Sequence, residues 1–310
     1  MSTMEQSKEI KILSENEVKD FLEFLNKNWK KDHVFFRDRE IFEYQHKTKK
    51  GDYTFLISKN ADGEIQSILG YIFCNNLQNS LWLAIWKSST NSGDGFRLLK
   101  KLTSITNLDF IGAIGISKDA QRLYKILGWK VDYTKHYFLN LNYSGLRKNE
   151  IKDSSKKYYI LSEISNIDDN PTCLPYKDED YYKYRFLSHP AYNYIFIKIQ
   201  HTPLLFIGRI IEYLGYKVFR IVDVIGEIHE ISFQDSLLNF MSDSKIDMIE
   251  MVMYDSSQPK IDMFLKKENE VIPLYTNPFL NKNIDVKLGF KSKNKRVRFF
   301  IGDSDQDRPN

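Results

Sequence analysis

Apolar residues along the chain recur in two patterns, short runs typical of strands and one-sided spacings typical of helices. Strands in the first half are predicted at EIKIL, YTFLIS, EIQSILGYIFC, SLWLAIW, DFIGAIGI and VDYTKHYFLNL. SLWLAIW is almost entirely apolar, which favours a central place in a sheet. Helices are predicted at SENEVKDFLEFLNKNW, from about residue 96 to 105, and at KDAQRLYKILG. Ser14 suits a helix N-cap, Asp62-Gly63 a hairpin turn, and Gly128 a helix end.

The second half repeats this alternation after a polar stretch, NYSGLRKNEIKDSSKK, which is rich in Lys, Asn and Ser. We therefore predict a first domain over 1–143, a linker over 144–157 and a second domain over 158–310. Strands are predicted at YYILSEI, NYIFIKI, PLLFIGRII, YKVFRIVDVIG, DMIEMVMY and RVRFFI, and helices around DEDYYKYRFL, at QDSLLNFM and from about Pro259 to Lys266. The shared order of buried strand, helix and buried strand favours an internal duplication of one mixed α/β unit.

The segment TNSGDGFRLLKKL places Gly93 and Gly95 between an apolar strand and an amphipathic helix. Such a turn exposes backbone N–H groups at a helix N-terminus, which suits a phosphate, although it can equally serve as a tight turn without a ligand. No Gly-Lys-Ser/Thr follows, which excludes a P-loop, and the third glycine of a dinucleotide fold is absent. If a ligand binds here, we expect a pyrophosphate held without a metal.

Composition narrows the class of protein. The 45 Lys and Arg residues and 41 Asp and Glu residues give a net charge of +4 without a basic stripe, which does not suggest a nucleic-acid-binding protein. Cys74 and Cys173 lie far apart without metal-ligand spacing and suit a reducing compartment. No apolar run approaches a membrane span, and the first residues lack an apolar signal region. We expect a cytoplasmic protein that does not bind membranes.

Two motifs resemble the GNAT (N-acetyltransferase) superfamily. TNSGDG is similar to its pyrophosphate loop, Gln/Arg-x-x-Gly-x-Gly/Ala before a helix, with Thr90 in place of Gln or Arg, and LYKILGW is similar to its Leu-Tyr-x-x-x-Gly-Phe segment. These matches cover about Leu81 to Leu141. Through YRFLSHPAYNY, FRIVDVIG and GDSDQDRPN the second half resembles the two-domain GNAT-like proteins of surface-polysaccharide gene clusters. The resemblance implies two tandem GNAT-like domains, each a twisted, mostly antiparallel sheet flanked by helices.

The same resemblance implies an enzyme that transfers an acyl group directly from acetyl-CoA or another acyl-CoA to an amine. The acceptor would be a nucleotide-linked amino sugar destined for a surface glycan, recognised by the second domain. The implied cofactor-binding residues are Trp86, Lys87, Ser88, Gly93, Asp94, Gly95 and Phe96. Tyr124 would protonate the departing CoA sulfur, a role that a phenol can perform; the alternative is an aromatic ring packed on the sheet.

An amine must lose a proton before it attacks, so a histidine or a carboxylate near the thioester, acting directly or through water, is a candidate general base. The candidates are His136 on the last strand of the first half, His189 in SHPAY, which could instead cap a helix, and His46. Acceptor recognition is expected from Arg185, Asp303, Asp305, Asp307 and Arg308, where an arginine could pair with a diphosphate. The acidic tail lacks the later residues of a calcium loop, so no metal is expected; the tail could instead be a solvated terminus.

Two other functions remain open from the sequence. A Fem-like aminoacyl transferase also duplicates this fold but uses aminoacyl-tRNA, which the modest net charge disfavours. A non-catalytic GNAT-fold binding protein would need neither the glycine turn nor Tyr124, and both are present.

Overall fold

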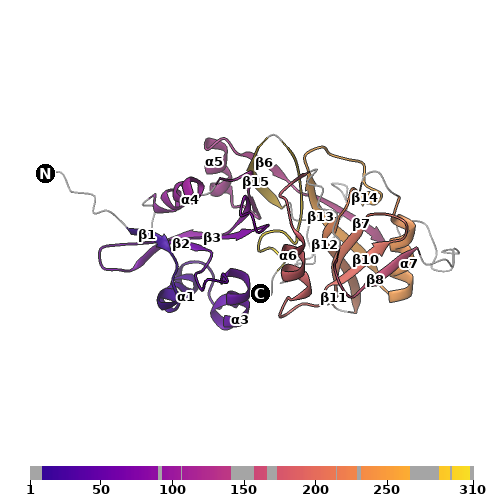
Figure 1. The fold of residues 1–310 in the computed structure, drawn as a ribbon, viewed down its shortest axis with the longest axis horizontal. Coiled ribbons are helices and arrows are strands. Elements are labelled where there is room, and N and C mark those ends of the chain that lie inside the picture. The colour runs from indigo at the N-terminus through magenta and orange to yellow at the C-terminus, as the bar shows by residue number, and fades with distance from the viewer. Residues whose placement is uncertain are drawn as a thin grey trace.

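The computed structural model describes residues 9–89, 93–105, 107–140, 157–165, 173–213, 215–228, 232–265, 286–293 and 295–307. They form two sheets with helices packed on them (Figure 1). Sheet 1 has the strand order β1-β2-β3-β4-β5-β15-β6. Sheet 2 has the order β14-β7-β13-β12-β11-β10-β8; in addition β16 pairs with β13, and β9 pairs with β16. We call sheet 1 with its helices the N-terminal unit, and sheet 2 with its helices the C-terminal unit.

The first part of the chain contributes most of the N-terminal unit. Its elements are β1 (Glu9–Ile12), η1 (Glu15–Glu17), α1 (Val18–Asn28), α2 (Val34–Arg37), α3 (Arg39–His46), β2 (Phe55–Lys59), β3 (Ile65–Phe73), β4 (Ser80–Ser88), α4 (Asp94–Ile105), β5 (Phe110–Ile114), α5 (Lys118–Ile126) and β6 (Lys130–Tyr133). The buried residues of α1, α2 and α3 pack on one face of the sheet, and those of α4 and α5 on the other. Both layers follow from apolar residues at helical spacing opposite apolar strand residues.

The remaining elements build the C-terminal unit, apart from one strand. They are β7 (Lys135–Asn140), β8 (Tyr158–Leu161), β9 (Cys173–Leu174), α6 (Glu179–Tyr182), η2 (Lys183–Leu187), β10 (Ile195–Ile199), β11 (Leu205–Tyr213), β12 (Tyr216–Ile225), α7 (Gln234–Ser244), β13 (Met248–Asp255), β14 (Phe264–Leu265), β15 (Lys287–Ser292) and β16 (Arg296–Phe300). The unit repeats the order of the first: β10, β11, β12, α7 and β13 correspond to β2, β3, β4, α4 and β5. In both units a helix connects two neighbouring parallel strands, β4 with β5 and β12 with β13. The fold class expected from the sequence, two tandem mixed α/β units, is therefore confirmed.

Local signals in the sequence place several turns correctly. The Ser14 hydroxyl donates a hydrogen bond to Glu17 at the start of η1. Asp62-Gly63 lies in the β2–β3 turn, where Gly63 has φ +81°. Gly128 follows α5 with φ +73°, a left-handed conformation that suits glycine at a helix end.

The two units exchange one strand each. β7 follows β6 directly in the chain, yet it lies in sheet 2 between β13 and β14, with His136 opposite Val252. In return β15 lies in sheet 1 between β5 and β6, with Gly289 opposite Ala113 and Val131. This exchange corrects the prediction of one continuous strand at VDYTKHYFLNL. It also corrects the division into 1–143 and 158–310, because each unit borrows a strand from across that boundary. Of the expected linker, only Lys157 lies within the described residues.

Two further predictions about elements were wrong or incomplete. The stretch from Pro259 to Lys266 was expected to be helical, but its described part is irregular up to the short strand β14. Ile261 and Met263 pack into the core of the C-terminal unit, so contact with sheet 2 overrides the helical spacing. β15 was not predicted at all, because KLGFKS is short and contains a glycine. Within the described ranges, no helix has the length and apolar character needed to cross a membrane.

Candidate functional site

Halfway along strand β4, its regular pairing with both neighbouring strands, β3 and β5, is interrupted. Opposite β3, Leu69 pairs with Trp86 and Tyr71 with Leu83, so β4 uses one residue more than β3 and forms a bulge. The parallel pairing of β4 with β5 ends at Leu83 and Ala113. Beyond that pair no described strand is hydrogen-bonded to β4 on the β5 side. We call the region between the two strands beyond that pair the β4–β5 wedge. Strand backbone that is not paired with a neighbouring strand is what an extended ligand can pair with.

The predicted glycine turn lies beside this wedge, at the N-terminus of α4. Gly93 has φ +75°, which favours glycine. A Cβ atom on Gly95 would lie 2.7 Å from Trp86 Nε1 and 3.0 Å from Ser88 Oγ, so the helix end packs closely on the last residues of β4. The Asp94 carboxylate is buried and lies 3.5 Å from Arg97 Nη1, while Phe96 is exposed. The turn thus places backbone N–H groups and the positive end of a 12-residue helix at the wedge.

Tyr124 on α5 is buried in an aromatic stack beside the wedge. Its ring centroid lies 4.4 Å from that of Trp129 and 5.8 Å from that of Trp86. The exchanged strand β15 packs under it: a Cβ atom on Gly289 would lie 2.9 Å from Tyr124 Cδ2. A phenol is protonated at neutral pH, and burial raises the pKa of Tyr124 further, so the side chain carries a proton that it can donate. Gly289 could not be found from the sequence, because only the strand exchange brings it to Tyr124.

The C-terminal unit has a corresponding wedge, but its own chain fills it. Parallel pairing of β12 with β13 ends at Ile221 and Met251. The chain after β16 enters the gap beyond that pair: the Ile301 N–H donates to the Val252 carbonyl and the Gly302 N–H to the Val222 carbonyl, both at 2.9 Å. A Cβ atom on Gly302 would lie 2.5 Å from the Val222 oxygen, so a side chain does not fit there. The second wedge therefore has no room for an extended ligand.

The segment Gly302–Asp307, which we call the tail, continues from the second wedge to the first. Ser304 Oγ donates to the Leu83 carbonyl oxygen at 3.0 Å, and a Cβ atom on Gly115, just after β5, would lie 2.7 Å from Gln306 Oε1. Arg185 Nη2 donates to the Ser304 carbonyl at 2.6 Å and to the Gly302 carbonyl at 3.2 Å. The alternative of a solvated terminus is wrong for this segment, which is mostly buried and contacts both strands of the β4–β5 wedge.

Two of the tail carboxylates expected to bind an acceptor instead anchor the tail. Asp303 lies 2.9 Å from Lys177 Nζ, which also lies 2.6 Å from Asp223. Burial alone would lower the pKa of Lys177, but these two carboxylates raise it well above its usual value, so the ammonium stays charged. Asp307 accepts two hydrogen bonds from Arg209, at 2.8 and 3.0 Å, and one from Tyr194 at 2.8 Å.

Arg185, bound to tail carbonyls, likewise has a structural partner. Asp305 is buried and accepts a hydrogen bond from Gln306 Nε2 at 3.0 Å. Asp305 lies next to Ser304, which contacts β4, so it is the expected acceptor-binding carboxylate whose neighbour contacts the wedge. Arg308 lies outside the described residues. No group of three His, Cys, Asp or Glu side chains in the described part of the chain is arranged to hold a metal ion.

Two of the candidate histidines are buried and contact other side chains of the chain. His136 lies on the exchanged strand β7, where its Nε2 is 3.2 Å from Glu250 Oε2 and Glu250 also pairs with Arg220. The expectation that it faces the N-terminal site is wrong because β7 belongs to sheet 2. His46 is buried among phenylalanine rings, with Nδ1 2.8 Å from Thr54 Oγ1. Neither histidine lies at the β4–β5 wedge.

His189 caps a turn, as the alternative interpretation of its motif has it. Its Nδ1 accepts the N–H groups of Ala191 at 3.1 Å and Tyr192 at 3.0 Å. A neutral imidazole in this position carries its proton on Nε2, so its basic lone pair is already used within the chain. Burial, together with the charge of Arg185, lowers the pKa of His189 to about 4. A general-base role for His189 therefore has no support in its geometry.

This environment predicts how His189 affects stability against pH. Because its folded pKa of about 4 lies below its usual 6.5, its contribution is present above pH 6.5 and is lost as the pH falls towards 4. In His189→Asn an amide oxygen can replace Nδ1 as acceptor but does not titrate. We expect wild type to lose more thermal stability than this variant between pH 7 and pH 5, measured by calorimetry; equal losses would show that His189 titrates normally.

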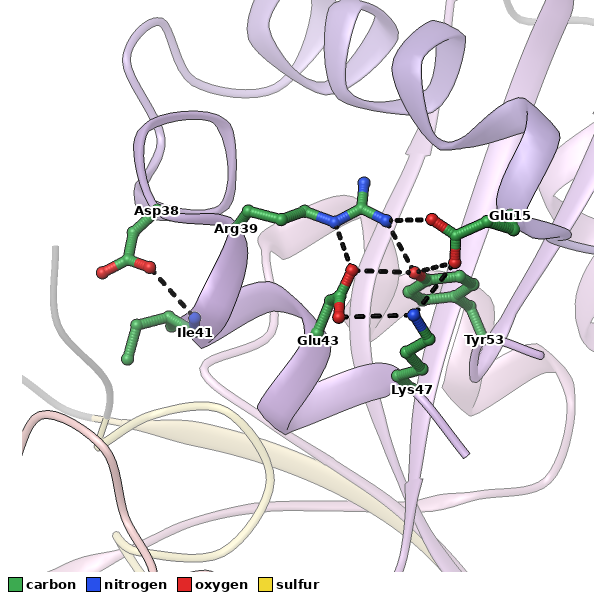
Figure 2. A network of polar contacts seen from close by, with 7 residues as sticks. All are labelled: Glu15, Asp38, Arg39, Ile41, Glu43, Lys47 and Tyr53. Atoms are coloured by element: carbon green, nitrogen blue, oxygen red, sulfur yellow. Dashed lines mark hydrogen bonds and ion pairs between the residues drawn. The ribbon is translucent and has the colours of Figure 1, made fainter. Parts of the chain in front are cut away.

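A separate cluster of charged side chains joins η1, α3 and the segment between α3 and β2 in the N-terminal unit (Figure 2). Arg39 lies 2.7 Å from Glu15 and 2.6 Å from Glu43, and Lys47 lies 3.0 and 3.3 Å from the same two carboxylates. The Tyr53 hydroxyl lies at its centre, 2.7 Å from Arg39 and 2.8 Å from Glu15. Two cations thus balance two carboxylates, and the cluster fixes α3 against the sheet.

Helix α3 in turn contacts the C-terminal unit. The rings of Tyr44 and Tyr184 stack with centroids 4.7 Å apart, and each hydroxyl donates to the backbone carbonyl of the other residue. On the β3–β4 turn, Asn76 N–H donates to Asp178 at 2.7 Å. Together with the exchanged strands and the tail, these contacts hold the two units in a fixed arrangement.

Comparison with known proteins identifies the fold. No family model and no curated protein matches the sequence. Among solved structures, a GCN5-related N-acetyltransferase from Anabaena variabilis matches with a TM-score of 0.57 and 11% identity, over 92% of this chain and 72% of that one. The chain has the GNAT fold, in two copies.

Two other solved structures support the same fold assignment. A protein from Pyrococcus horikoshii assigned as an acetyltransferase matches with a TM-score of 0.53 and 10% identity, over 98% of this chain and 96% of that one. A protein from Enterococcus faecalis assigned as an N-acyltransferase matches with a TM-score of 0.54 and 11% identity, over 93% and 72% of the two chains. At these sequence identities, the similarity shows that the chains share a fold.

Proposed function

We propose that the protein is a cytoplasmic acyl-CoA-dependent N-acyltransferase whose active site is the β4–β5 wedge. The observation that carries the proposal is the convergence of three features at one opening: the β4 bulge, the glycine turn at the start of α4, and the protonated phenol of Tyr124. Each of them suits a different part of an acyl thioester of coenzyme A. The folds of the matching structures, which carry acetyltransferase and acyltransferase names, support the same class of enzyme.

The residues at the wedge fit acyl-CoA part by part. The backbone N–H groups from Gly93 to Phe96, at a positive helix end, suit the pyrophosphate. The backbone of Trp86, Lys87 and Ser88, beyond the last pair with β5, suits the amides of the pantetheine. Acetyl-CoA or a longer acyl-CoA supplies the acyl group as a thioester. Backbone N–H groups at the β4 bulge, beside Leu83, are the donors that we assign to the thioester oxygen.

In this proposal Tyr124 donates one proton to the departing sulfur, and the acceptor ammonium releases its proton to solvent. The proton that Tyr124 donates is its phenolic proton, which a phenol retains at neutral pH. The acceptor amine must lose a proton before attack. Asp305, buried in the tail beside the wedge, is the side chain that we assign to binding the ammonium group.

As acceptor we propose a nucleotide-linked amino sugar used for a surface glycan. The resemblance of the C-terminal half suggests this class, and the half-buried rings of Tyr44, His189 and Tyr192, near the tail, offer apolar surface to a base or sugar. Because Arg185 is bound within the chain, the acceptor diphosphate is not assigned to it. Asp303 and Asp307 are also bound within the chain, so the sugar hydroxyls are not assigned to them.

Calorimetry with CoA tests the proposal. We expect one CoA per chain, because the chain itself fills the second wedge. In Gly95→Val the side chain would collide with Trp86 and Ser88 and displace the start of α4, so CoA affinity should fall at least tenfold.

Gly215→Asn is the matched control. Gly215 lies in the β11–β12 turn, where a Cβ atom meets nothing within 4 Å and asparagine tolerates the positive φ. Its CoA affinity should equal that of wild type. Two CoA per chain would contradict the filled second wedge, and no binding by wild type would favour a non-catalytic binding protein.

A further inference from the structure

We propose that Ser304 is a positioning residue for acyl transfer, acting through its hydrogen bond to the Leu83 carbonyl at the start of the β4–β5 wedge. The inference rests on the proposed function and deepens it. It assigns to the C-terminal unit a part in shaping the acyl site of the N-terminal unit, in addition to any role in binding the acceptor.

The contact lies where the sheet divides. Leu83 is the last residue of β4 that pairs with β5, and the bulge follows it directly. Ser304 Oγ lies 3.0 Å from the Leu83 carbonyl oxygen, the nearer acceptor of its one hydroxyl proton, and 3.3 Å from Asp305 Oδ1; the residue is buried, with 1% exposed. A hydrogen bond in this position fixes the direction of the peptide that leads into the bulge, and so the direction of the bulge N–H groups.

The tail is rigid enough to hold that peptide in place. Arg185 fixes the Ser304 carbonyl at 2.6 Å. Before it, Asp303 pairs with Lys177; after it, Gln306 packs on Gly115 at the end of β5, and Asp307 pairs with Arg209. The tail therefore contacts both strands of the wedge while it is anchored to the C-terminal unit, and it sets how far the two strands separate.

The backbone at Ser304 indicates that its hydroxyl is used. Ser304 has φ +61°, a left-handed backbone conformation that is strained for residues other than glycine. Glycine would adopt this conformation without strain, but it has no hydroxyl for the Leu83 carbonyl. Strain retained at a site contact is what a functional role for that side chain predicts.

Two variants separate this role from a purely structural one. Ser304→Gly removes the hydroxyl and relieves the strain, whereas Ser304→Ala removes the hydroxyl and keeps the strain. His201→Gly is the matched control: His201 has φ +58° in the β10–β11 turn, away from the wedge, so the substitution relieves similar strain without touching the site.

The assay measures thiol release from acetyl-CoA with a nucleoside-diphosphate-linked amino sugar, together with CoA affinity and thermal unfolding. We expect kcat to fall about tenfold in both Ser304 variants, since a small misplacement of reacting groups is costly. CoA affinity should stay within about twofold, because the pyrophosphate turn at α4 is untouched. Ser304→Gly should unfold at the same temperature as wild type or higher, and His201→Gly should keep full activity.

Other outcomes overturn the inference in distinguishable ways. Unchanged kcat in both Ser304 variants, with an active wild type, overturns the role of Ser304 alone. That role is equally overturned if kcat falls only in a variant whose unfolding temperature falls as well. Wild type that neither binds CoA nor releases thiol overturns the proposed function and, with it, this inference.

Discussion

A chain that ends at residue 143 is expected not to fold on its own, although it contains the glycine turn and the LYKILGW segment. Without β15, strands β5 and β6 lose their common neighbour in sheet 1, and the space filled by Leu288 and Phe290, 0% and 4% exposed, becomes empty. At the same time β7 loses β13 and β14, which leaves the buried Phe138 and Leu139 exposed on an unpaired strand. Exposed apolar strands of this kind associate with other chains.

Expression of residues 1–143, of residues 144–310 and of both fragments together tests this expectation. Each fragment alone should be insoluble or should show no cooperative unfolding by circular dichroism. The two fragments produced together should associate and unfold cooperatively, because the exchanged strands bind the fragments as they bind the two units in the intact chain. A cooperative transition for residues 1–143 alone would show that the exchange is dispensable.

Replacing Tyr124 by phenylalanine is expected to lower turnover by roughly 10²–10³-fold, which lies within the range of general acid catalysis. The ring, its stack with Trp129 and its contact with Gly289 are retained, so only the proton donor is lost. CoA affinity should therefore change by less than about twofold.

Tyr71→Phe is a suitable control for that measurement. Tyr71 belongs to the same core cluster as Tyr124, and burial raises its pKa as well, but it lies on β3. The control should keep wild-type turnover and lose little stability. If both variants turn over at the wild-type rate, the role of Tyr124 is packing of the aromatic stack.

The parts of the site that could be predicted are those encoded by neighbouring residues. Gly93 and Gly95 follow an apolar strand and precede a helix, and Tyr124 precedes the helix-ending Gly128, so each signal is complete within a few residues. Pairing between distant strands has no such local signal. His136 was therefore placed in the wrong unit, because the alternation of β7 shows which residues share a face but not which sheet they join.

The contacts of the tail could not be predicted from the sequence either. Its three aspartates indicated a polar function, but composition alone did not show that Lys177 and Arg209 would neutralise Asp303 and Asp307. Ser304 carries no recognisable motif. Its importance follows from a contact with Leu83, more than two hundred positions earlier in the chain, and from a positive φ that only the folded tail imposes.

The exchange of β7 and β15 also determines when the proposed acyl site can form during protein synthesis. Strand β6 leaves the ribosome about 150 residues before β15, which must lie beside it and under Tyr124. At about 5–20 residues per second, the N-terminal unit waits roughly 8–30 s for its missing strand. During that time β7 and the open edge of β5 are exposed. We therefore expect that the two units do not fold one after the other from the N-terminus. The wedge is completed only when the tail has been synthesised.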